Sequence, residues 1–259
     1  MWLDRRTRLF VAAVIAFSTP AMAATITWDA AQNITGAADV NTSGTLIGAY
    51  SVSRLQGSNN QPNATVNGVP FRSMTMSTSS AAVPGFALST TATFSTNLAA
   101  AGQQTPYGSL PAEYQAILQN TVETFIPFPE GQFPGGTATL LISGLVAGAI
   151  YGFQWWADVS YQAFTGLSSA TAGNSVQLRR NTTAAIGGVG QYAIGRFTAD
   201  GSTQTILLGG PPNALFNAFQ LRQLSAVPDE GGTQILLTCS LALIFSVGWL
   251  ARRPSLSAQ

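Results

Sequence analysis

Three side chains that could bind a sugar alternate along one apolar segment of the chain. In the segment 150–160, Gln154, Trp156 and Asp158 have the two-residue spacing that places side chains on one face of a β-strand. An exposed indole ring can stack on the C–H face of a sugar, while an amide and a carboxylate bond its hydroxyl groups. The pattern favours a ligand-binding surface for carbohydrate. The alternative is that a loop or the edge of a second sheet covers Trp156.

Carboxylates are the second group that could do chemistry. Glycoside hydrolysis needs two of them, roughly 5 to 9.5 Å apart. The spacing in the sequence does not identify any two carboxylates as such a pair. Glu113 and Glu123, for example, are ten residues apart, at opposite ends of a predicted helix. A carboxylate-dependent polysaccharide hydrolase or lyase therefore stays an alternative function. The acids between residues 24 and 226 are Asp29, Asp39, Glu113, Glu123, Glu130, Asp158 and Asp200.

Most other catalytic chemistry lacks the residue types that it needs. The chain has no histidine, which removes Ser-His-Asp and Cys-His arrangements and every histidine metal site. Its single cysteine, Cys239, lies in the apolar C-terminal segment. The glycine-rich segment 187–190 precedes a strand and carries no lysine, so it indicates a turn and not a phosphate loop. We expect no catalytic residue, no metal and no cofactor, and therefore a protein that is not an enzyme.

The charge balance argues against a nucleic-acid partner. The chain contains no lysine, and its formal net charge is +1 at pH 7. A protein that binds nucleic acid needs a basic surface to neutralise phosphates. The polarity comes instead from Thr, Ser, Asn, Gln and Gly.

The segments that must position these residues have the pattern of β-strands. Short runs of β-branched and aromatic residues recur between Gly, Asn, Ser and Pro. The segment 113–124 differs, because Tyr114, Ile117, Leu118 and Val122 have helical spacing after Pro111. The predicted strands are 25–28, 45–52, 65–71, 85–94, 137–142, 150–160, 175–180, 191–199, 204–208 and 214–224.

Many short strands with turn signals and one short helix predict an all-β fold. We expect an antiparallel, jelly-roll-like β-sandwich spanning residues 24–226 as one domain. On the segment 150–160, Tyr151, Phe153, Trp155, Ala157 and Val159 should face the core.

The N-terminus has the pattern of a secretory signal peptide, residues 1–23. A basic stretch with Arg5, Arg6 and Arg8 precedes a short apolar run, 9–17. Ala21 and Ala23 form a small-x-small cleavage site, so signal peptidase is an expected partner. The alternative is an uncleaved N-terminal anchor.

The C-terminus, residues 227–259, has the pattern of a membrane segment. The uncharged run 233–250 would reach about 27 Å as a helix, enough to cross a hydrocarbon core. Arg252 and Arg253 follow it, and the positive-inside rule would keep them in the cytoplasm. The alternative is a buried core helix. A short motif, Val227, Pro228, Asp229, Glu230, Gly231 and Gly232, comes before the run.

This C-terminal combination of motif, apolar helix and basic stop resembles a PEP-CTERM sorting signal of the VPD variant. Val227, Pro228 and Asp229 match the motif, and Glu230 stands where that variant usually has Ser or Gly. The segments 145–151, 190–200 and 217–222 are also similar to the extracellular parts of such proteins. The resemblance implies recognition by an exosortase-type processing enzyme in a Gram-negative bacterium that makes exopolysaccharide.

Together these patterns predict an exported, non-enzymatic protein. It would be held transiently in the inner membrane by its C-terminal helix, then placed at the cell surface or in the exopolysaccharide matrix. Polysaccharide is a candidate ligand. A further alternative is a simple membrane-anchored envelope protein that is not processed.

Overall fold

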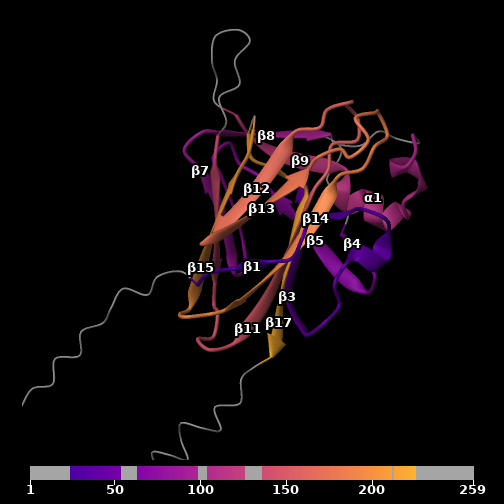
Figure 1. Ribbon diagram of the computed structural model, residues 1–259. Coiled ribbons are helices and arrows are strands. Elements are labelled where there is room, and N and C mark those ends of the chain that lie inside the picture. The colour runs from indigo at the N-terminus through magenta and orange to yellow at the C-terminus, as the bar shows by residue number, and fades with distance from the viewer. Residues whose placement is uncertain (1–23, 54–62, 99–103, 126–135, 212, 226–259) are drawn as a thin grey trace, which may run out of the picture.

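The computed structural model in Figure 1 describes residues 24–53, 63–98, 104–125, 136–211 and 213–225. Strands dominate this part of the chain. Its helical elements are one α-helix, α1 (Ala112–Leu118), and two 3-10 turns, η1 (Ala37–Asp39) and η2 (Tyr107–Ser109). The prediction of an all-β fold with one short α-helix is confirmed for these residues.

The described strands form three sheets. The first sheet has the order β1-β14-β11-β17-β3-β5-β4, and β2 also pairs with β14. Its strands are β1 (Thr27–Trp28), β2 (Gln32–Asn33), β3 (Thr45–Ser53), β4 (Ala64–Val66), β5 (Val69–Thr75), β11 (Ile150–Ala157), β14 (Gln191–Thr198) and β17 (Ala218–Ser225).

The second sheet has the order β13-β12-β15-β10-β7-β6, and the third is the small sheet β16-β9-β8. The second contains β6 (Ser80–Val83), β7 (Phe86–Thr90), β10 (Ala138–Ser143), β12 (Leu167–Ala172), β13 (Asn174–Arg179) and β15 (Thr203–Gly209). The third contains β8 (Thr93–Leu98), β9 (Asn120–Phe125) and β16 (Leu215–Phe216).

The first and second sheets pack as a β-sandwich around an apolar core. Consecutive strands cross between them: β10 lies in the second sheet, β11 in the first and β12 in the second again. Rings from both sheets meet in the core, where the Phe86 and Phe219 centroids are 5.2 Å apart. The predicted core face of β11 is confirmed, because its residues belong to the apolar cluster between the two sheets: Tyr151, Phe153, Trp155, Ala157 and Val159.

One strand pair departs from the predicted antiparallel arrangement. β3 and β5 run parallel, with Tyr50 opposite Arg72 and Val52 opposite Met74. A parallel pair needs a connection longer than a hairpin, and the chain between β3 and β5 contains β4. The predicted single strand 65–71 is in fact the hairpin β4–β5. Asn67 and Gly68 form its turn with φ of 49° and 75°, the positive values that a type I′ hairpin requires.

The predicted helix 113–124 is correct only in its first half. Pro111 precedes α1 as expected, but the helix ends at Leu118 and β9 begins at Asn120. Thr121, Val122 and Thr124 are β-branched, and such residues lose side-chain freedom in a helix but pack well on a sheet. The change places Glu123 on a strand that pairs with β16.

Candidate ligand-binding site

The face of β11 predicted to bind sugar is buried. Gln154, Trp156 and Asp158 each expose 1% or less of their surface. A second apolar cluster covers this face, with Tyr114, Ile117 and Leu118 from α1. Figure 1 shows α1 on the side of the first sheet that lies away from the second sheet. The interpretation of this face as an exposed carbohydrate-binding surface is therefore wrong, and the alternative of a covered Trp156 is correct.

The polar residues of this face bond the N-terminal segment that lies over them. The Gln154 side chain donates to the Asp39 carbonyl at 2.7 Å and accepts from the Asn41 amide at 2.9 Å. Arg222 on β17 donates to the carbonyls of residues 42, 43 and 44. Buried polar groups need such partners, so their presence on the strand does not require contact with solvent or ligand.

Trp156 belongs to a hydrogen-bonded chain of side chains. Its Nε1 donates to the Tyr114 hydroxyl at 2.9 Å, and that hydroxyl donates to Asp39 Oδ2 at 3.2 Å. Its ring meets Phe71 edge-on, with centroids 5.7 Å apart. Burial, followed by the Asp39 charge, raises the pKa of Tyr114 well above its usual value, which keeps the phenol protonated.

Asp158 is also a structural residue. Its Oδ1 accepts from the Gly190 amide at 2.7 Å, and its own amide donates to Asn217 Oδ1 at 2.6 Å. Burial raises the pKa of the Asp158 carboxyl well above its ordinary value, while bonds from Gly190 and Ser160 act in the opposite direction. A carboxyl with a raised folded-state pKa stabilises the fold fully below its unfolded pKa of about 3.9 and loses that contribution as the pH rises through the folded pKa.

The Asp158→Asn variant should therefore gain stability relative to the wild type as the pH rises. The amide can still accept from Gly190 but does not ionise. We expect the difference in unfolding free energy to grow by about 1 kcal/mol or more between pH 4 and pH 8. Urea denaturation at several pH values measures it, with exposed Asp200→Asn as the control. Parallel stability profiles for Asp158→Asn and the wild type would contradict the assignment.

The terminal sites predicted from sequence lie outside the described residues. These are the cleavage site at Ala21 and Ala23, the motif 227–232, the helix 233–250 and the stop at Arg252 and Arg253. In the part of the chain that the structure does describe, no helix is both long enough and apolar enough to cross a membrane.

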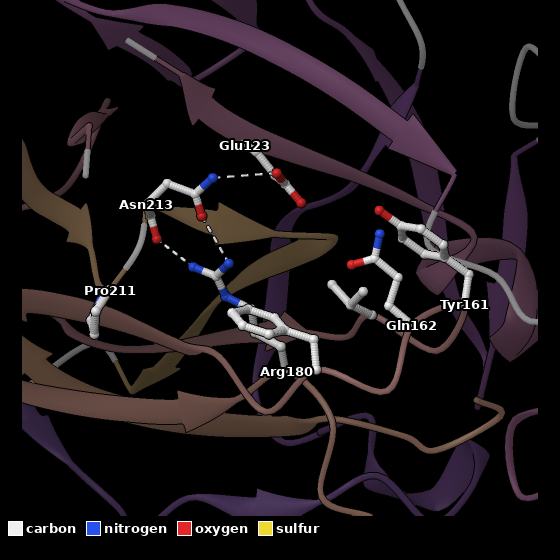
Figure 2. A pocket seen from close by; sticks show the side chains of 8 residues that line it. Glu123, Tyr161, Gln162, Arg180, Pro211 and Asn213 are labelled. Carbon is white, nitrogen blue, oxygen red and sulfur yellow. Dashed lines mark hydrogen bonds between the residues drawn. The ribbon is translucent and has the colours of Figure 1, made fainter. Parts of the chain in front are cut away.

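A different set of residues surrounds a cavity of about 720 Å³ (Figure 2). It lies where strand β9 meets three connecting segments. These are the segment after β11, the residue after β13 and the segment between β15 and β16. Its volume falls within the range of about 300–1,000 Å³ that small-molecule sites occupy. The lining residues are Glu123, Val159, Tyr161, Gln162, Phe164, Arg180, Pro211 and Asn213.

Arg180 forms the buried base of this cavity. It exposes 2% of its surface, and its guanidinium donates to Ser168 Oγ at 2.9 Å, to the Leu167 carbonyl at 2.9 Å and to Asn213. Desolvation lowers the pKa of Arg180 to about 10, and the Glu123 charge partly opposes this. The side chain stays cationic at neutral pH and is held in one orientation.

Asn213 links Arg180 to Glu123. Its Oδ1 accepts from Arg180 Nη1 at 2.8 Å, and its Nδ2 donates to Glu123 Oε2 at 3.3 Å. Figure 2 shows the three side chains in sequence along one wall, with Tyr161 and Gln162 across the cavity. Partial burial and then the Glu123 charge raise the pKa of Tyr161, so its hydroxyl remains a hydrogen-bond donor.

The cavity combines aromatic surface with groups that bond hydroxyls. Tyr161 and Phe164 supply rings, and Phe164 is 43% exposed. Glu123, Gln162 and Asn213 supply a carboxylate and two amides. Within the described lining Glu123 is the one carboxylate. The described residues contain no group of three His, Cys, Asp or Glu that could hold a metal ion.

The sequence indicates Glu123 only as one of seven carboxylates, on a predicted helix, and gives it no partner. It does not predict that the other lining residues belong to a site. The positions 123, 161–164, 180 and 213 have no short-range pattern in the sequence, because strand β9 and three connections bring them together. The one local signal is the cluster of Tyr161, Gln162 and Phe164 directly after a predicted strand, since loops carry many binding residues.

No protein-family model and no curated protein matches the chain. This chain is similar to part of a solved structure described as "Structural basis for the promiscuous specificity of the carbohydrate-binding modules from the beta-sandwich super family". The match is 15% identical, covers 49% of this chain and has a TM-score of 0.17. It spans little more than half of that chain, 56%. A TM-score of this size does not establish a common fold.

Proposed function

We propose that this chain is an exported, non-enzymatic protein whose sandwich binds carbohydrate in the cavity beside Glu123. The observation that carries the proposal is the meeting of Tyr161 and Phe164 with Glu123, Gln162 and Asn213 around one cavity of about 720 Å³. This is the chemistry first expected of the β11 face, but strand β9 and three connections supply it at a different place in the fold.

The two kinds of lining group match the two kinds of sugar surface. An aromatic ring packs on the C–H face of a pyranose, and amides and a carboxylate bond its hydroxyls. The single carboxylate in the described lining supports binding over hydrolysis. The two-carboxylate mechanism needs a second acid roughly 5 to 9.5 Å away.

Replacing Phe164 with alanine should weaken glycan binding by about 10-fold or more, because one stacking surface is lost. The wild-type chain and the variant, both purified at full length in detergent, are compared on a glycan array and then by calorimetry. Leu141→Ala is the matched control, since Leu141 is 39% exposed on β10 and does not line the cavity. Equal binding by Phe164→Ala and the wild type would place the carbohydrate site elsewhere.

We further propose that residues 1–23 direct export and that the tail 227–259 is a PEP-CTERM-like sorting signal read by an exosortase-type enzyme. The support is the combination of motif, apolar run and basic stop in the sequence. Mass spectrometry of the mature protein tests it. Sorting predicts an N-terminus at Ala24 and a C-terminus near the motif, whereas an end at Gln259 would favour the unprocessed membrane-anchored alternative.

The jelly-roll-like character of the sandwich is part of the same proposal. Its support is the alternation of strands between the two sheets along the chain, from β10 to β11 to β12 and from β14 to β15 to β17. The parallel β3–β5 pair is a local departure from that pattern.

A further inference from the structure

We infer that the cavity selects neutral glycans over acidic ones, and that Glu123 is the residue that makes the selection. This inference rests on the proposed carbohydrate binding and names the ligand class of the same site. It follows from the hydrogen-bond partners of Arg180 and Glu123, the two oppositely charged residues that line the cavity.

The positive charge of Arg180 is directed into the protein. All three guanidinium nitrogens donate to protein acceptors: Nε to Ser168, Nη1 to Asn213, and Nη2 to Leu167 and Asn213. Four of the five N–H groups of the side chain are occupied in this way. An acidic sugar would find at most one free N–H group on Arg180, a residue that exposes 2% of its surface.

The negative charge of Glu123 is presented to the ligand. Its Oε2 accepts from Asn213 at 3.3 Å, and no hydrogen bond to Oε1 is formed within the described part of the chain. Figure 2 shows this carboxylate above Arg180, directed toward the space that Tyr161 and Gln162 face. Glu123 is half-buried, so a ligand that enters reaches the carboxylate before it reaches the guanidinium.

These positions decide which ligand groups fit. A sugar hydroxyl can donate to Glu123 Oε1, and such charge-assisted bonds are roughly twice as strong as neutral ones. A uronate carboxylate in the same place has no proton to donate and repels Glu123. The remaining polar groups, the Tyr161 hydroxyl and the Gln162 amide, can serve either ligand and do not discriminate.

The test compares sugars that differ only at C6, such as galactose and galacturonate oligosaccharides or glucose and glucuronate oligosaccharides. Their affinities for the purified full-length chain are measured by calorimetry at low salt. We expect the neutral member of the bound pair to bind about 10-fold more tightly, with the ratio narrowing as salt is added. Equal or tighter binding of the acidic member would overturn the inference.

Glu123→Gln is the decisive variant. The glutamine oxygen would accept from Asn213 Nδ2, which turns the amide N–H groups toward the cavity as donors. We expect the neutral-to-acidic ratio to fall to about 1 or to invert. The exposed Asp200→Asn variant should leave the ratio unchanged. A ratio that Glu123→Gln does not alter, in a variant whose thermal unfolding matches the wild type, would also overturn the inference.

The outcomes separate this inference from the function on which it rests. Binding without preference removes only the role of Glu123 in selection. Absence of binding to every neutral and acidic oligosaccharide removes the proposed carbohydrate function and the inference with it. Phe164→Ala should weaken both members of a pair by the same factor, because stacking does not depend on the C6 group.

Discussion

Replacing Trp156 with alanine should lower the free energy of unfolding by about 3–5 kcal/mol, the usual cost of removing a buried tryptophan. The ring is fully buried between the first sheet and α1, and it contacts the rings of Phe71 and Tyr192. The variant would leave a cavity in the second apolar cluster and would remove the hydrogen-bond donor to the Tyr114 hydroxyl. Urea denaturation followed by circular dichroism measures the loss.

A Trp156→Phe variant separates packing from the hydrogen bond. Phenylalanine keeps much of the apolar contact but cannot donate to the Tyr114 hydroxyl, so we expect a smaller loss, about 1–2 kcal/mol. If Trp156→Ala cost less than about 0.5 kcal/mol, as a surface substitution does, the ring would have to be exposed. Glycan binding by Trp156→Phe should equal that of the wild type, because Trp156 does not line the cavity.

Replacing Arg180 with alanine should have an effect of similar size, about 3–5 kcal/mol. The side chain is buried and donates four hydrogen bonds to Ser168, Leu167 and Asn213. Its removal leaves these acceptors buried and unpaired, and it leaves Glu123 without the nearby opposite charge. Asn213 would also lose the contact that orients its amide toward Glu123, so glycan affinity should fall as well.

Arg179 provides the matched control for Arg180. It is the neighbouring arginine, and its side chain is exposed on β13, so Arg179→Ala should change stability by no more than about 0.5 kcal/mol. Arg180→Lys should recover little of the loss, since one ammonium group cannot reach acceptors on three residues as a planar guanidinium does. Equal stability of Arg180→Ala and Arg179→Ala would contradict a structural role for the buried guanidinium.

Local patterns could predict alternation within a strand but not every strand boundary. The predicted strand 85–94 is in fact divided between β7 and β8, which belong to different sheets. Alternation along β11 predicted the core face of Tyr151, Phe153 and Trp155, and all three lie in the apolar cluster between the two sheets. Such predictions succeed because the side chains of a strand alternate by covalent geometry alone. The segment 113–124 shows the limit. Helical spacing of apolar residues continued across Val122, but pairing of β9 with β8 and β16 decided the conformation there.

The candidate site could not be assembled from the sequence in the same way. Glu123, Tyr161, Arg180 and Asn213 become neighbours only when strands of the three sheets are in place. Trp156 shows the opposite error. Its polar neighbours Gln154 and Asp158 predict an exposed face, but that face is buried. The partners of their side chains include Asp39, Asn41 and Gly190, which lie 32 or more residues away.

The amino-acid sequence alone is enough to predict the all-β character of the described chain, the core-facing side of β11 and the kinds of catalysis for which the residue types are missing. Those properties depend on side-chain identity and on the two-residue period of a strand. The packing of distant segments decides that the Trp156 face lies in the second apolar cluster and that Glu123, Asn213 and Arg180 line one cavity. Burial and proximity depend on which distant segment packs against a surface, and local spacing does not encode that choice.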